Sequence, residues 1–259
     1  MTSELRTRTI VGVALIALAL GALLSGGLLF WALLSAAGVL MQGEWANLVG
    51  ATADQRKASM FAMSVPLALL CPLAAGVDWP VLVAAAASFF FVMLTSRNIA
   101  LALGIGYAAL PIVSLQFLRG QEPNGQGLLL AFWSLALVWA TDIGAYFAGR
   151  SIGGPKLAPR VSPSKTWSGL AGGVLAALIT GYLLHRLAGL PMQLAAASGL
   201  LAVAAQLGDL LESWMKRRAG VKDSGTLLPG HGGVMDRLDG VVAAAPLATL
   251  LYLLMGQAL

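Results

Sequence analysis

Long apolar runs, separated by short polar segments, occupy most of this chain. They predict nine membrane-spanning helices at residues 9–24, 28–42, 59–76, 79–96, 98–118, 127–149, 167–186, 191–212 and 239–256. The first two runs are about 15 residues each, short of the roughly 20 that cross a bilayer upright, and Ser25, Gly26 and Gly27 between them predict a turn or a kink. We therefore expect an all-α fold, a polytopic membrane helix bundle of about nine transmembrane helices with active-site loops in the cytoplasm.

Composition agrees with this pattern and excludes other classes. Hydrophobic residues make up 58% of the chain and charged residues only 10%. The mean hydropathy of +0.83 is far above that of a soluble domain. Cys71 is the only cysteine, which excludes an internal disulfide and a cysteine-based metal site. With no repeat and no long linker, residues 1–259 are expected to form one integral membrane domain.

The basic residues predict the orientation of the chain. A net charge of +5 without any nucleic-acid motif argues against nucleic acid and for cytoplasmic loops of a membrane protein. With nine spans and an inside N-terminus, only Arg119 and Arg186 of the 16 Lys and Arg residues face outside. The loops at 150–166 and 213–238 then face the cytoplasm, and we expect a multi-pass protein of the cell (inner) membrane.

Acidic residues lie in or beside the spans, where charge is costly and commonly functional. Asp142 lies near the end of one span, Asp209 and Glu212 are three residues apart on one helix face, and Asp236 and Asp239 repeat that spacing. We expect several of these carboxylates to gather at the cytoplasmic ends of three helices. Oxygen ligands without cysteine suit Mg²⁺. The alternative is that the acids form helix-end ion pairs with Arg150, Arg217 or Arg237.

Two polar loops carry further candidates. The loop from Arg150 to Gly169 places Lys165 among the hydroxyls of Ser162, Ser164 and Thr166 just before a helix, which favours an anion site over a loop that only fixes topology. The loop from Ser213 to Asp239 has a Gly-rich centre that can approach phosphates closely. His231 within it could contact phosphate, transfer a proton or only structure the loop.

A short segment, residues 42–48, contains Glu44 and Trp45 between two predicted spans. It is expected to lie in the membrane interface or to be an ordinary loop with an anchoring tryptophan.

A long spaced pattern runs through the loop from Ser213 to Asp239. It reads Ser-x-hydrophobic-Lys-Arg, then Lys-Asp, then His-Gly-Gly-hydrophobic-x-Asp-Arg-hydrophobic-Asp. Its residues are Ser213, Lys216, Arg217, Lys222, Asp223, Gly225, Pro229, His231, Gly232, Gly233, Asp236, Arg237 and Asp239. In this pattern, filled without a gap, the chain resembles the phosphatidate cytidylyltransferase (CDP-diacylglycerol synthase) family. The resemblance extends upstream through TDIGAYFAGR and SPSKTWSG, so residues 126–259 are expected to be the catalytic half and residues 1–125 to supply N-terminal spans. One departure is Ser168, where the family commonly has Glu, and its role is left open.

The resemblance implies Mg²⁺-dependent transfer of the cytidylyl group of CTP to phosphatidic acid, giving CDP-diacylglycerol and pyrophosphate for phospholipid biosynthesis. CTP, phosphatidic acid and membrane lipids are the expected partners; one or two cations, and a monomer or a homodimer, are left open. The resemblance assigns metal binding to Asp209, Asp236 and Asp239. It assigns catalysis to the same three residues together with Lys222 and Arg237. Substrate binding falls to Ser164, Lys165, Lys216, Arg217, Asp223, His231, Gly232 and Gly233, with Asp142 a weaker candidate.

Two alternatives remain from the sequence. A CTP-dependent polyprenol or phytol-type lipid kinase would use similar acidic and basic loops but release CDP. An ion or solute transporter would use buried acids to relay ions, although transporters often show inverted repeats and broken helices near the midplane. Here the charges concentrate at one end of the spans.

Overall fold

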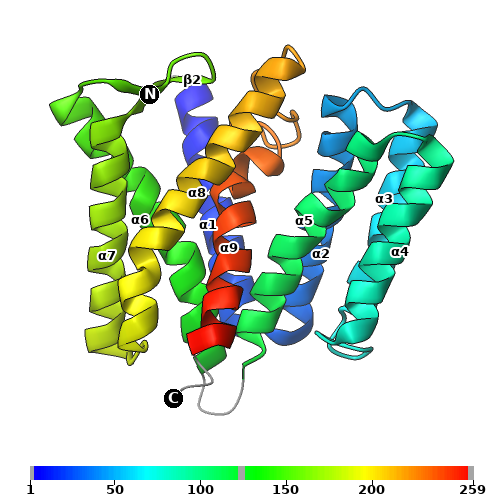
Figure 1. Cartoon of the computed structure of the whole chain (residues 1–259), viewed down its shortest axis with the longest axis horizontal. Coiled ribbons are helices and arrows are strands. Elements are labelled where there is room, and N and C mark those ends of the chain that lie inside the picture. The colour runs from blue at the N-terminus through cyan, green and yellow to red at the C-terminus, as the bar shows by residue number, and fades with distance from the viewer. Residues whose placement is uncertain (1–2, 122–125, 256–259) are drawn as a thin grey trace. The chain divides into compact units, whose positions relative to one another are not determined.

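A computed structural model describes residues 3–121 and 126–255, with side chains from residue 9 (Figure 1). Its described residues form the helices α1 (Ser3–Ser25), α2 (Gly27–Leu48), α3 (Ala53–Leu69), α4 (Trp79–Ser96), α5 (Ile99–Arg119), α6 (Gln126–Ile152), α7 (Trp167–Ala188), α8 (Met192–Arg218) and α9 (Met235–Met255), and the strands β1 (Lys156–Ala158) and β2 (Ser162–Thr166). Within these residues, seven helices are long and apolar enough to cross a membrane. The predicted all-α membrane fold is confirmed, while nine spans stay a prediction.

Two predicted boundaries were wrong. The helix expected at 59–76 is α3, which runs from Ala53 to Leu69. It begins earlier than expected because Thr52 and Gln55 form a capping box at its N-terminus. The segment 42–48 is not a loop, since α2 continues through it to Leu48 and buries Glu44 and Trp45.

The chain forms two compact units. The predicted single domain stays a prediction, and its division at residue 125 falls in 122–125, outside the described residues.

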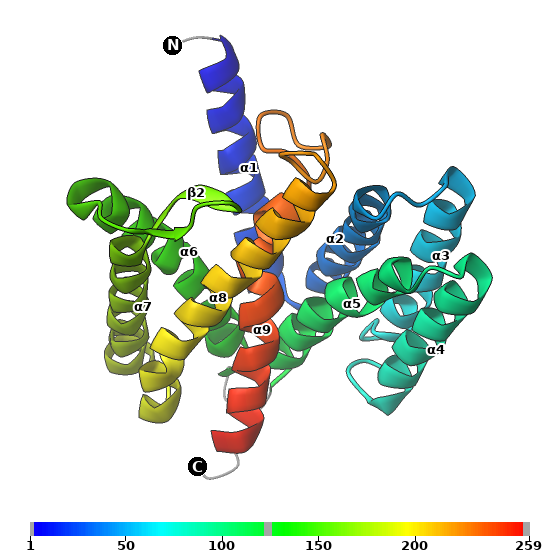
Figure 2. The same ribbon diagram turned by 45° about the horizontal axis from the view of Figure 1, so that its top comes forward.

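The first unit comprises the residues up to Gln116 and the loop Arg218–Leu238. In it, α2 packs on α3 and α3 on α4 (Figure 2). Trp45 Nε1 of α2 donates to the Ala100 carbonyl of α5 at 2.7 Å, and Ser88 Oγ of α4 donates to the Ala62 carbonyl of α3 at 2.8 Å. These hydrogen bonds supplement an apolar core and fix how the four helices face one another.

The second unit comprises Phe117–Arg217 and Asp239–Leu259. Here α6 and α7 run side by side and are joined at one end by the β1–β2 hairpin (Figure 1). Their backbones approach closely, since a Cβ on Gly172 would lie 2.9 Å from the Gly144 carbonyl oxygen. Small residues at such a contact are what allows two membrane helices to pack this tightly.

The hairpin was not predicted from the sequence. Its strands pair antiparallel, Lys156 with Thr166 and Ala158 with Ser162. Thr166 then caps α7, its hydroxyl accepting from the Gly169 amide at 3.0 Å. The hairpin therefore presents Ser164 and Lys165 immediately before a capped helix N-terminus.

Candidate active site

The loop between α8 and α9 is a series of turns, as the sequence predicts. His231 N donates to the Leu228 carbonyl at 2.8 Å, and Leu228 N donates to the Gly232 carbonyl at 2.9 Å. Pro229 and Gly230 occupy the two central positions of this turn, and Gly230 has φ of 75°, as a type II turn requires. The turn brings Lys222 and His231, nine positions apart, to the same concave surface.

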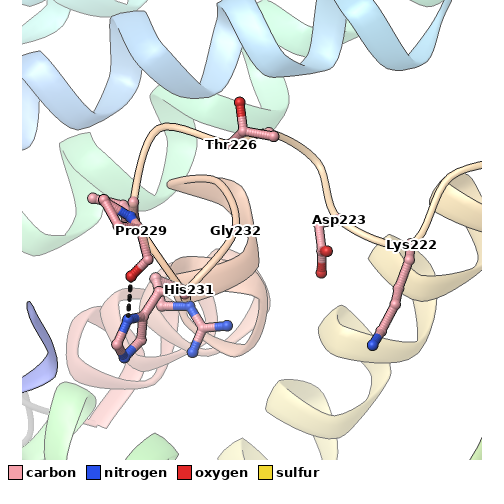
Figure 3. Close-up of a pocket in the computed structure, with 10 residues that line it drawn as sticks. Lys222, Asp223, Thr226, Pro229, His231 and Gly232 are labelled. Carbon is pink, nitrogen blue, oxygen red and sulfur yellow. Dashed lines mark hydrogen bonds between the residues drawn. The ribbon is translucent and has the colours of Figure 1, made fainter. Parts of the chain in front are cut away.

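This loop surrounds a cavity of about 360 Å³. Figure 3 shows Lys222 and Asp223 coming from the start of the loop and His231 and Gly232 from its later part. The lining residues are Lys222, Asp223, Gly225, Thr226, Leu228, Pro229, Gly230, His231, Gly232 and Arg237. Two cations beside glycines, whose backbone a ligand can approach closely, suit a phosphate-bearing molecule.

Asp236 holds the loop from within. Its Oδ2 accepts hydrogen bonds from Ser224 N (2.9 Å), Ser224 Oγ (2.9 Å) and Gly233 N (2.7 Å). The residue is 8% exposed. In this arrangement Asp236 is part of the support of the loop, and its predicted role as a metal ligand stays a prediction.

Glu44 of α2 is a second buried carboxylate against this loop, and sequence reasoning missed it. Its Oε1 accepts from Val234 N, and its Oε2 accepts from Met235 N and from Ser224 Oγ. The available signal was that Glu44 is the one acidic residue in the apolar run 27–48. Nothing in the local sequence indicated a partner 180 residues away.

His231 contacts the first helix of the same unit. A Cβ on Gly12 of α1 would lie 3.2 Å from His231 Nε2. The imidazole Nδ1 lies 3.4 Å from the Pro229 carbonyl oxygen (Figure 3). These contacts, together with its place in the cavity wall, fit both a ligand-contacting and a loop-structuring role.

In the second unit, Asp209 of α8 forms an ion pair with Lys165 of β2. Lys165 Nζ lies 2.5 Å from Asp209 Oδ2, with the two side chains 17% and 25% exposed. Ser213 Oγ, one turn further along α8, donates to Asp209 Oδ1 at 3.3 Å. The candidate anion site of the hairpin and a candidate metal ligand are thus joined directly.

Further carboxylates lie near Asp209. Asp239 of α9 interacts electrostatically with Asp209, Asp142 and Lys216. Asp142 of α6 accepts from Gln206 Nε2 at 3.4 Å. Asp239 is thus within electrostatic range of Asp142 and Asp209, whereas Asp236 belongs to the first unit. The gathering of these acids at the cytoplasmic ends of three helices stays a prediction.

These carboxylates do not form a ready-made metal cage. In the part of the chain that the structure describes, no three His, Cys, Asp or Glu side chains are grouped closely enough to hold a metal ion alone. Their chemistry still fits Mg²⁺, which keeps several waters and is commonly held by one or two protein carboxylates plus substrate phosphates. The donor set therefore suits a cation that a phosphate ligand helps to hold.

Glu212 and Lys216 form a buried ion pair one turn apart on α8, with Lys216 Nζ 3.1 Å from Glu212 Oε1. The Glu212 side chain is 0% exposed. The expectation that acids pair with nearby cations thus holds for Glu212, but its partner is a lysine of the family pattern rather than an arginine.

The remaining candidates lie on the surface of their elements. Ser164 of β2 and Arg217 of α8 are exposed.

Ser168, which departs from the family pattern, donates to the Gly153 carbonyl and lies 3.0 Å from Thr166 Oγ1. The Ser168 hydroxyl therefore ties the start of the hairpin to the cap of α7.

Taken together, the helices and the polar loop define a multi-span membrane protein with a cationic, phosphate-compatible pocket. The chain matches the family model described as the cytidylyltransferase family over residues 6–255. It belongs to that family, and the resemblance stated from its motifs is confirmed.

Curated relatives carry a more particular name. The chain is 43% identical over 257 residues to the phosphatidate cytidylyltransferase of Brucella suis, covering 97% of this chain and 93% of that protein. Shorter matches include the phosphatidate cytidylyltransferases of Bacillus subtilis, 45% identical over 50% of this chain and 49% of that protein, and of Haemophilus influenzae, 43% identical over 49% and 46%.

Proposed function

We propose that this protein transfers the cytidylyl group of CTP to phosphatidate, giving CDP-diacylglycerol and pyrophosphate. The observation that carries the proposal is the cavity of the α8–α9 loop, where Lys222, Arg237 and His231 line a space built on exposed glycine backbone. Such a wall suits the phosphates of a nucleotide. Family membership over residues 6–255 and the names of the relatives support the same reaction.

The reaction joins two anions. A phosphate oxygen of phosphatidate attacks the α-phosphorus of CTP, a new P–O–P bond forms, and the bond between the α-phosphorus and the bridging oxygen breaks to release pyrophosphate. Because the nucleophile is already ionised, no strong general base is needed. What the protein must supply is positive charge that offsets repulsion and stabilises the leaving group.

In this proposal, Lys222 and Arg237 bind phosphates in the loop cavity, Gly232 lets the backbone approach them, and His231 contacts a phosphate oxygen. Lys165 and Lys216 of the second unit are further phosphate-binding cations. Lys165 forms an ion pair with Asp209, and Lys216 forms one with Glu212. A phosphate that reaches either lysine would compete with the carboxylate for it.

We propose Mg²⁺ as the cofactor, with Asp209 and Asp239 as its protein ligands and Asp142 nearby. When bound, the cation would polarise phosphate oxygens and neutralise the charge of the leaving pyrophosphate. Asp236 is a further candidate ligand. Its hydrogen bonds to Ser224 and Gly233 also support the loop.

The proposed localisation is a cell (inner) membrane, with the loop and the hairpin on the cytoplasmic side. The support is the distribution of Lys and Arg along the sequence. CTP is water-soluble and phosphatidate is not, so a site at the membrane surface is where both substrates can meet.

The products distinguish this function from a CTP-dependent lipid kinase. The purified protein, incubated with CTP, phosphatidate and Mg²⁺, is expected to release pyrophosphate and no CDP, measured by anion-exchange chromatography of the aqueous phase. Release of CDP, with a polyprenol or phytol as acceptor, would instead establish the kinase. Absence of both products with every lipid tested would contradict the proposal.

A further inference from the structure

Glu44 lies outside the family pattern on which the functional assignment rests, yet its carboxylate accepts several hydrogen bonds from the α8–α9 loop and the start of α9. Three donors converge on its carboxylate: Val234 N at 2.8 Å, Met235 N at 2.8 Å and Ser224 Oγ at 2.9 Å. These donors come from both ends of the segment 224–235. One side chain of α2 therefore joins Ser224, within the loop, to the start of α9.

The loop is shaped around this carboxylate. A Cβ on Gly225 would lie 2.8 Å from Glu44 Oε1, and a Cβ on Gly233 would lie 2.5 Å from Glu44 Oε2. Real Cβ atoms do not approach oxygen so closely, so a side chain at either position would displace the carboxylate from its present place. Glu44 is only 7% exposed, and a buried carboxylate must have its hydrogen bonds satisfied.

The carboxylate also lies at the start of α9. Val234 and Met235 supply main-chain N–H groups at the N-terminal end of that helix, where an acceptor and a negative charge are both favourable. Glu44 thus acts as an N-terminal cap supplied by a distant helix. It stabilises the place where Asp236 and Arg237 leave the loop and enter α9.

Ser224 couples Glu44 to Asp236. Its Oγ lies 2.9 Å from Glu44 Oε2 and 2.9 Å from Asp236 Oδ2. A hydroxyl has one hydrogen and can donate it fully to one acceptor at a time. The loss of either carboxylate therefore changes the hydrogen bond that the other one receives.

Glu44, Ser224 and Asp236 are not among the residues that line the cavity, whereas their neighbours Gly225, Gly232 and Arg237 are. We propose that Glu44 is a positioning residue, which holds the α8–α9 loop in the conformation that binds the phosphates of CTP. This rests on the proposed function in that CTP is taken as the ligand of the cavity. Glu44 does not touch the ligand.

A positioning role predicts a particular kinetic effect. If the loop adopts its binding conformation for only a fraction of the time, the apparent affinity falls by that fraction, and saturating ligand restores the conformation. Glu44→Gln keeps the size of the side chain but replaces one oxygen with an NH₂ group. Because both oxygens of Glu44 accept hydrogen bonds, the replacement loses at least one of them in either orientation of the amide. Loss of such a charged hydrogen bond predicts a roughly tenfold to hundredfold rise in KM for CTP, with kcat within about threefold of the wild type.

The test measures initial rates against CTP concentration for wild type, Glu44→Gln, Glu44→Asp and the control Trp45→Phe in detergent micelles. Trp45→Phe removes a hydrogen bond to Ala100 from the same helix and is expected to leave KM unchanged. Glu44→Asp keeps the charge on a shorter side chain and is expected to give an intermediate KM. The rate of tryptic cleavage after Lys222 should rise in Glu44→Gln and fall again with CTP.

Wild-type KM and wild-type cleavage in Glu44→Gln would overturn the proposal, as would a loss of kcat at unchanged KM. If Glu44→Gln does not accumulate as folded protein, Glu44→Asp decides, and an unchanged KM in that variant would overturn it. Failure of the proposed function is distinguishable, because the wild type itself would then form no CDP-diacylglycerol from CTP and phosphatidate.

Discussion

Lys165 Nζ lies 2.5 Å from Asp209 Oδ2, so the hairpin before α7 and the helix α8 meet through a pair of opposite charges. The two residues are 44 positions apart, and both were candidates for the site on sequence grounds. The pair shows that a predicted phosphate ligand and a predicted metal ligand share one environment in the second unit.

Replacement of Asp209 tests the consequence of that pair. Asp209→Asn removes a candidate cation ligand and the counter-charge of Lys165, and we expect transfer to fall by about 100-fold or more, since loss of one transition-state electrostatic contact commonly costs that much. Steady-state rates at several Mg²⁺ concentrations measure the effect. Asp54→Asn, at an exposed acid in the first turn of α3, is the matched control. Activity of Asp209→Asn near that of the control would exclude both roles for Asp209.

Asp236→Asn is expected to abolish transfer while the protein stays folded in detergent. The replacement turns one carboxylate oxygen into an NH₂ group and removes the negative charge. If the NH₂ group takes the place of Oδ2, it cannot accept the hydrogen bonds from Ser224 and Gly233. Product formation and gel-filtration behaviour are measured together. Near-normal product formation would rule out a metal-binding role and a need for these loop contacts.

Gly232 is expected to tolerate no side chain. Its φ is 78°, and a Cβ there would lie 2.6 Å from Asp236 Oδ2. Gly232→Ala should therefore displace the loop and remove most CTP-dependent activity, measured by product formation. Gly106→Ala is the control, because no atom lies within 4 Å of a Cβ at that helical position. Equal activities of the two variants would show that the turn adapts to a side chain.

Glu212→Gln is expected to lower the free energy of unfolding of the protein. It takes the charge partner from buried Lys216, and breaking a buried ion pair commonly costs about 3 kcal/mol or more. The free energy of unfolding in detergent measures this. Lys57→Gln, at an exposed charge of α3, is the control and should change it by less than about 0.5 kcal/mol. A similarly small change for Glu212→Gln would mean that Lys216 does not depend on this partner.

Contacts between residues close together in the sequence could be predicted, whereas contacts between residues far apart in the sequence could not. The spacing of Asp209, Glu212 and Ser213 on one helix predicted their common face, because a helix fixes neighbours three and four residues apart. The Lys165–Asp209 pair depends on how a hairpin and a helix pack, which no local pattern encodes. The hairpin itself escaped prediction because its strands are only three and five residues long and β2 includes Pro163.

Glu44 shows the same limit more strongly. Hydropathy ended the predicted span at residue 42, since polar residues lower the local average there, but buried polar side chains with partners continue the helix to Leu48. The partner of Glu44 is 180 residues away in sequence. A single acid at the end of an apolar run indicates a buried contact but does not identify it.

The most direct measurement of the proposed function follows the α-phosphate of CTP. Purified protein is incubated with [α-³²P]CTP, phosphatidate and Mg²⁺, and the lipids are extracted into chloroform. We expect the label in a lipid that comigrates with CDP-diacylglycerol, and no lipid label when [γ-³²P]CTP is used instead. Lipid labelled from the γ-phosphate but not from the α-phosphate would contradict cytidylyl transfer and establish a kinase.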